Sequence, residues 1–162
     1  MFGVKYRTTQ FDAVSGLDLM ELLRTVHPCE VLKKTEVEVM GNWVPLNDPD
    51  NVNFYVKDVL GIVPPLKVLI ALSDTVSAFS FEFLSGWKGV KVPSRFISDA
   101  VSVSTAYSKP LITQLVQSGS ASLKELEEYY SLEDAFKMFE INVAKGVNDA
   151  LSSEAAAKAS KR

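Results

Sequence analysis

Cysteine and histidine are almost missing from this sequence of 162 residues, which holds one of each, Cys29 and His27. A single cysteine cannot form an intrachain disulfide, and this fits a reducing compartment. His27 and Cys29 flank a proline, where they offer neither a third orienting group for a nucleophile nor enough ligands for a metal. We therefore expect a helix-end turn with a packed cysteine, and no catalytic residues, metal or cofactor.

A long apolar run is missing as well. The best candidate is VLGIVPPLKVLIAL, residues 59–72, which contains Pro64, Pro65 and Lys67. This run is too short to span a bilayer, and the stretch MFGVKYRTTQFDA lacks an apolar core of signal-peptide length. The sequence therefore predicts a soluble, intracellular protein without a membrane partner.

An excess of basic residues is also absent, as the net charge of −3 and the pI of about 5.2 show. The segment SASLKELEEYYSLEDAFKMFEI has the two capped helices of a helix-turn-helix DNA reader. Residues 120–140, however, contain two basic and six acidic side chains, a net charge of −4. DNA phosphates would repel such a helix, so a DNA-binding regulator is the least favoured alternative and no nucleic-acid partner is expected.

Other catalytic signatures are missing too. FLSGWKG has two glycines and a lysine but does not match the phosphate-binding pattern GxxxxGK[ST]. The carboxylates of KELEEYYSLED gather at predicted helix N-termini, where the helix dipole favours negative charge. These acidic residues therefore indicate a solvated face and not a catalytic pair, and we expect no enzyme activity.

The residues that are present suit a globular fold, because 47% are apolar and 23% are charged. We expect a mainly α protein, a single-domain helical bundle with a small β-hairpin (α+β). This single domain is expected to span residues 1–151. Residues 152–162 are expected to form a flexible, alanine-rich basic tail.

The first third of the chain is expected to form a strand over 4–11, a helix from Ser15, a hairpin over 35–46 and a short helix over 50–60. Asp18 supports a helix start at Ser15, and Pro28 ends that helix. Gly41 and Asn42 supply the hairpin turn, and Pro45 belongs at an edge because it cannot donate to a strand ladder.

Further helices are expected from Pro65, over 94–108, from Pro110 to Gly119, from Ser122 and from Ser131. Glu125 and Asp134 complete capping boxes for the last two. The apolar stripe of the helix from Pro65 is predicted to comprise Leu66, Leu69, Ile70, Ser73, Val76, Phe79 or Ser80, Phe83 and Trp87. The stripe of the last helix comprises Leu132, Phe136, Phe139, Val143, Val147 and Leu151, joined by Ala135 and Ala150.

Four stretches in this order resemble the small tail assembly chaperones of tailed bacteriophages, including those that assist baseplate hubs. They are FDAVSGLDLMELLRTV, VSAFSFEFLSGW, KPLITQLVQSGSASLKELEEYYSLEDAFKMFEI and NVAKGVNDAL, residues 11–26, 76–87, 109–141 and 142–151. The resemblance covers most of the chain and is most specific in the last third. It implies a non-catalytic protein that binds a tape-measure or hub subunit in the host cytoplasm during virion morphogenesis.

The resemblance leaves a second role open, that of a small virion structural protein in the tail or in head completion. A homo-oligomer is compatible with either role. The candidate docking residues are Phe79, Phe81, Phe83 and Trp87. Their alternation with Ser80 and Glu82 also fits a strand, in which Phe79, Phe81 and Phe83 would share one face, but the three helical turns before them favour a helix. In a helix Phe79, Phe83 and Trp87 follow one stripe while Phe81 points to the opposite side, so we expect Phe81 to remain exposed for a partner unless a neighbouring helix covers it.

Overall fold

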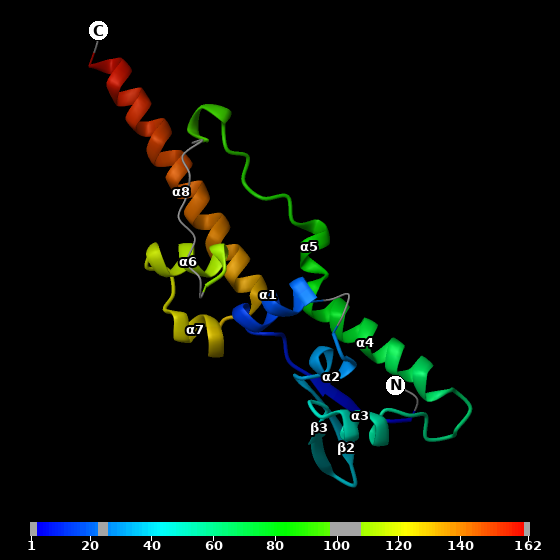
Figure 1. Ribbon diagram of the computed structural model, residues 1–162. Helices are drawn as coiled ribbons and strands as arrows, with labels where there is room; N and C mark the ends of the chain where they lie inside the picture. The colour runs from blue at the N-terminus through cyan, green and yellow to red at the C-terminus, as the bar shows by residue number, and fades with distance from the viewer. Residues whose placement is uncertain (1–2, 23–25, 98–107, 161–162) are drawn as a thin grey trace.

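The computed structural model describes residues 3–22, 26–97 and 108–160 (Figure 1). It confirms a mainly α fold with a small antiparallel sheet. In the described residues the elements are β1 Tyr6–Thr8, α1 Ala13–Leu22, α2 Pro28–Val31, β2 Thr35–Val39, β3 Asn42–Pro45, α3 Pro49–Tyr55, α4 Pro65–Phe81, α5 Phe83–Gly86, the 3-10 turn η1 Ser94–Phe96, α6 Pro110–Gln117, α7 Leu123–Glu128 and α8 Leu132–Ala159. The sheet, α2 and α3 form one end of an elongated molecule, and α8 extends from its centre to the opposite end (Figure 1).

The sheet contains the predicted hairpin, with β1 added to its free side in the order β1-β2-β3. The hairpin turn lies one residue earlier than predicted, because Met40 and Gly41 have φ angles of 50° and 84°. Positive φ at two successive turn residues matches the right-handed twist of the strands. Val37 is buried beneath the sheet, and Pro45 lies on the edge strand as expected.

The helix starts follow from side chains that accept backbone N–H groups. Both predicted capping boxes are present, at Ser122 of α7 and Ser131 of α8. The predicted start of α1 at Ser15 is wrong, because the Ser15 backbone N–H donates to the Asp12 carboxylate at 2.8 Å and α1 begins at Ala13. Pro28 is the first residue of α2, so it opens a short helix.

The buried face of α4 matches the predicted stripe in its second half, at Val76 and Ser80, and differs from it in the first half. Four residues spaced by four, Val68, Leu72, Val76 and Ser80, are buried. Leu66 and Ile70, which belong to the predicted stripe, are at least half exposed. Both rows have helical spacing, so the periodicity alone does not decide between them.

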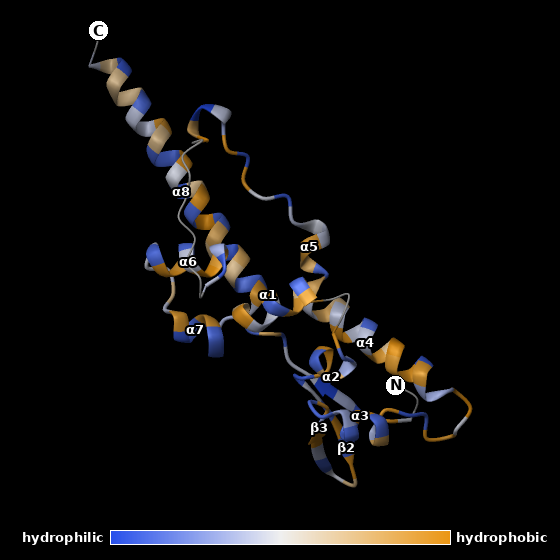
Figure 2. Cartoon of the chain, viewed as in Figure 1, coloured by the Kyte–Doolittle hydropathy of each residue, from blue (hydrophilic) through white to orange (hydrophobic). Residues whose placement is uncertain are grey.

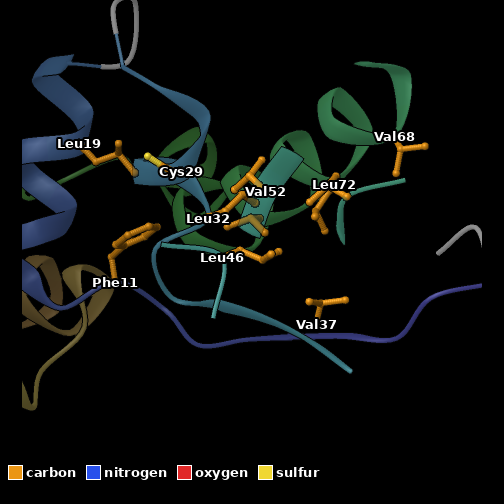
Figure 3. Packing of buried hydrophobic residues seen from close by; sticks show 11 residues of the cluster. Phe11, Leu19, Cys29, Leu32, Val37, Leu46, Val52, Val68 and Leu72 are labelled. Atoms are coloured by element: carbon orange, nitrogen blue, oxygen red, sulfur yellow. The ribbon is translucent and has the colours of Figure 1, made fainter. Parts of the chain in front are cut away.

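The buried apolar side chains form two clusters that meet at α1. The sheet-side cluster lies between the sheet, α2, α3 and α4 (Figure 3), and its buried members are Phe11, Leu19, Cys29, Leu32, Val37, Leu46, Val52, Val56, Val68, Leu72 and Val76. The bundle-side cluster joins α1, α6, α7 and α8, with Ala13, Ile112, Leu115, Ala121, Leu126 and Ala135 buried. Gly16 permits the close approach of α1 and α8, because a Cβ there would lie 3.0 Å from the Cβ of Leu132.

The last helix continues to Ala159, so residues 152–159 of the expected tail are helical, as the end of α8. In the predicted helix over 94–108 the structure shows the short turn Ser94–Phe96, and residues 98–107 lie outside the described residues. Within the described ranges, no helix combines the length and apolarity needed to cross a membrane.

Candidate protein-binding surface

His27 and Cys29 form a helix-start turn with a packed cysteine. The His27 ring nitrogen Nδ1 accepts the backbone N–H of Cys29 at 3.3 Å and lies 3.0 Å from its Sγ. Burial, followed by the charges of Glu30 and Asp48, raises the pKa of the Cys29 thiol. A thiol that stays protonated is a poor nucleophile and metal ligand. Among the described residues, no three His, Cys, Asp or Glu side chains gather as metal ligands would.

The aromatic run is helical, as predicted, but the structure divides its four rings. Phe81 packs against the sheet-side cluster and stacks on Phe11, with ring centroids 6.1 Å apart and an interplanar angle of 12°. Phe81 is therefore partly buried, and Phe11, in the segment before α1, supplies part of its cover.

Phe83 and Trp87 face the first turns of α8. Both rings meet Phe136 edge to face, with centroid distances of 5.6 Å for Phe83 and 4.8 Å for Trp87. The Trp87 indole N–H also donates to Glu140 at 3.2 Å. Of the four predicted docking residues, Phe79 is the most exposed, at 51%. Phe81 thus packs on the sheet-side half of the molecule, while Phe83 and Trp87 pack on α8.

A second group of exposed apolar side chains lies at the other end of α4, in the apolar run 59–72, which was not predicted to bind a partner. Five side chains on the loop before α4 and on its first turns are between 50% and 77% exposed: Val59, Leu60, Ile62, Leu66 and Ile70. We call these residues the 59–70 patch. Figure 2 shows this loop and the start of α4 coloured as hydrophobic. Soluble proteins seldom leave so many neighbouring apolar side chains in water without a binding role.

The loop of the 59–70 patch is fixed by one carboxylate. Asp58 accepts backbone N–H groups from Leu60 at 3.2 Å, Ile62 at 2.8 Å and Val63 at 3.0 Å. These bonds hold the pKa of Asp58 below its usual range, with the bond from Val63 as the main cause. Val63 packs against the sheet-side cluster, while Leu60 and Ile62 point into solvent. The exposed side chains are therefore presented on an ordered turn, which lowers the entropy lost on binding.

The first half of α4 is apolar around most of its circumference, and this explains why the sequence pattern assigned Leu66 and Ile70 to the buried stripe and not to an exposed patch. The run LKVLIAL contains one polar residue, Lys67. Since a helix buries one face against the core, the remaining apolar side chains stay outside. The sequence does contain a signal for the exposed surface. The start of α4 has two apolar rows, Leu66–Ile70 and Val68–Leu72, and a helix that packs by one side can bury only one of them.

Lysines border the patch. Lys57 lies just before it, with its ammonium 4.7 Å from the ring centroid of Phe54, and Lys67 is exposed within it. In the part of the chain that the structure describes, neither lysine forms an ion pair. The nearest unengaged carboxylate along α4 is Asp74, one turn beyond Ile70. The patch is thus an apolar surface with a positive border.

The comparisons with known proteins add no relative. No protein-family model, no curated protein and no solved structure matches this chain.

Proposed function

We propose that this chain is a non-catalytic protein-binding factor that assists the assembly of a bacteriophage tail or baseplate. Its role is to hold an apolar segment of a tape-measure or hub subunit in the host cytoplasm before that segment is built into the particle. The observation that carries the proposal is the 59–70 patch, an ordered and uncovered apolar surface at one end of α4.

The chemistry of the patch suits the capture of apolar protein segments. Its five side chains are aliphatic, so they contribute burial without demanding a specific hydrogen-bonding partner. Removing them from water would stabilise a complex by roughly 25 cal/mol for each Å² of apolar surface covered, before the entropic costs of association. A surface of this kind holds a partner reversibly, as a factor that later releases its client requires.

The setting in phage assembly is supported by the four sequence stretches that resemble tail assembly chaperones. Two of these stretches supply structural parts: the aromatic run closes α4 and α5 onto α8, and the acid-rich stretch forms α6, α7 and the start of α8. They build the bundle-side half of the molecule. The 59–70 patch lies in the part of the chain between the first and second of these stretches.

Co-purification tests the proposal. The chain is co-expressed with the tape-measure and hub subunits of the phage that encodes it, and a tag on the chain is used to recover complexes. We expect one of these subunits to co-purify and to remain soluble only when the chain is present. Recovery of neither subunit, with both of them soluble on their own, would overturn the proposed function.

A further inference from the structure

We propose that the segment bound by the 59–70 patch is an amphipathic helix whose apolar face is bordered by aspartate or glutamate. This inference rests on the proposed function and adds the chemistry of the partner. Three features of the described residues support it: the helical row of the patch, its positive border, and the first turn of α4, which holds no acidic residue.

The shape of the patch favours a helical partner. Leu66 and Ile70 are four residues apart on the outer face of α4, where such rows form the ridges that pack into the grooves of another helix. Leu60 and Ile62 add further apolar side chains beyond the helix start, on the turn held by Asp58. A partner helix lying along α4 would therefore contact the row on α4 and extend over the loop.

The charges of the patch favour acidic residues on that partner. Lys57 and Lys67 are free of ion pairs among the described residues. They outnumber the one carboxylate between them, Asp58, which keeps its negative charge while it accepts three backbone N–H groups. In addition, α4 has no acidic residue in its first turn and no side-chain cap at Pro64, so the positive end of its helix dipole adds to the field of the lysines. Acidic side chains beside the partner's apolar face would complement this field.

The same charges oppose a second copy of this chain as the occupant. In a two-fold symmetric dimer the patch meets itself, so both copies bring the same surplus of positive charge to one interface, Lys57 and Lys67 against a single Asp58 from each copy. Like charges across an interface cost free energy, so the patch is not self-complementary.

Two synthetic helical peptides test the inference by fluorescence anisotropy at low salt. Both carry the same leucine and isoleucine face; the first has glutamates along its borders and the second has lysines. We expect the wild-type chain to bind the glutamate peptide at least tenfold more tightly, with a gap that narrows as salt is added. The double variant Lys57→Glu/Lys67→Glu should reverse the preference, and Lys57→Gln/Lys67→Gln should reduce it without introducing new repulsion.

The outcomes separate this inference from the proposed function. Equal binding of both peptides, lost in Leu60→Ser/Ile62→Ser, would overturn the acidic partner while the docking surface stands. Peptide binding that this serine variant leaves unchanged would overturn both uses of the patch. Concentration-dependent dimers in sedimentation that the serine variant abolishes would assign the patch to a second copy. Patch-dependent binding to vesicles of anionic lipid, with no binding of either peptide, would assign it to a membrane and overturn the inference.

Discussion

Both ends of α4 are rich in apolar side chains, and they differ in what covers them. At the C-terminal end, Phe81 stacks on Phe11, and Phe83 beyond the helix packs against Phe136. At the N-terminal end, Leu66 and Ile70 have no such cover. The difference shows that distant segments decide which apolar side chains of a helix stay exposed, whatever its local composition.

The covering residues explain why the aromatic end is structural. Phe11 belongs to the sheet-side cluster and Phe136 to α8, so the rings between them join the two halves of the molecule. At the N-terminal end of α4, the row that begins at Val68 packs into the sheet-side cluster. The outer row, Leu66 and Ile70, stays exposed among the described residues. Substitutions of covered side chains, at the aromatic end and on the buried face of α4, should lower stability. Substitutions of exposed side chains on the outer face should leave stability nearly unchanged.

The largest effect is expected from a pair of substitutions on opposite faces of α4. Leu72→Ala removes a side chain that is 3% exposed in the sheet-side cluster, and should cost about 2–4 kcal/mol of unfolding free energy through the cavity it leaves. Ile70→Ala, on the outer face, should change stability by less than about 0.5 kcal/mol. Urea unfolding followed by circular dichroism measures both. Equal losses would mean that the outer row of α4 is part of a core.

A smaller difference in unfolding free energy is expected between two variants of the aromatic run. Phe81→Ala should destabilise the fold by about 2–3 kcal/mol, less than a fully buried ring, because Phe81 is partly exposed while it packs on Phe11. Phe79→Ala serves as the matched control and should be nearly neutral. The same urea titrations decide, and a Phe79→Ala loss as large as that of Phe81→Ala would contradict the division of the four rings.

The smallest effect concerns the turn that presents the 59–70 patch. The three backbone N–H groups depress the pKa of Asp58 in the folded state. Its contribution to stability is therefore present above the unfolded pKa of about 4, and is lost as the pH falls through the folded pKa. Asp58→Asn should lower the melting temperature slightly at pH 7, and the gap to wild type should close as the pH falls below about 4.

Thermal melts between pH 7 and pH 2.5 measure this gap. Glu125→Gln is a useful control, because Ser122 depresses the pKa of Glu125 at the start of α7 in the same way. It should show the same pH trend and leave peptide binding at the patch unchanged. A gap between Asp58→Asn and wild type that stays constant across this pH range would show that the carboxylate does not stabilise the turn.

The parts of the fold that were predictable depend on local chemistry. Ser122 and Ser131 cap their helices through residues three positions away, and the hairpin follows from alternation around a glycine turn. The cover of Phe81 by Phe11 was not predictable in this way, because the two residues lie 70 positions apart. The 59–70 patch was missed for a related reason. Two rows of α4 fit a buried face equally well, and only the position of the sheet-side cluster selects one.

The most direct test of the central claim compares the two ends of α4 in a single binding assay. The tail subunit recovered by co-purification is titrated against the wild-type chain, Leu60→Ser/Ile62→Ser and Phe79→Ser, with Ile141→Ser as a control of matched exposure on α8. Each variant is first shown to melt within a few degrees of wild type. We predict that Leu60→Ser/Ile62→Ser weakens binding at least tenfold, while Phe79→Ser and Ile141→Ser bind as wild type does. Loss of binding in Phe79→Ser with full binding by Leu60→Ser/Ile62→Ser would contradict the account and return the docking site to the aromatic run.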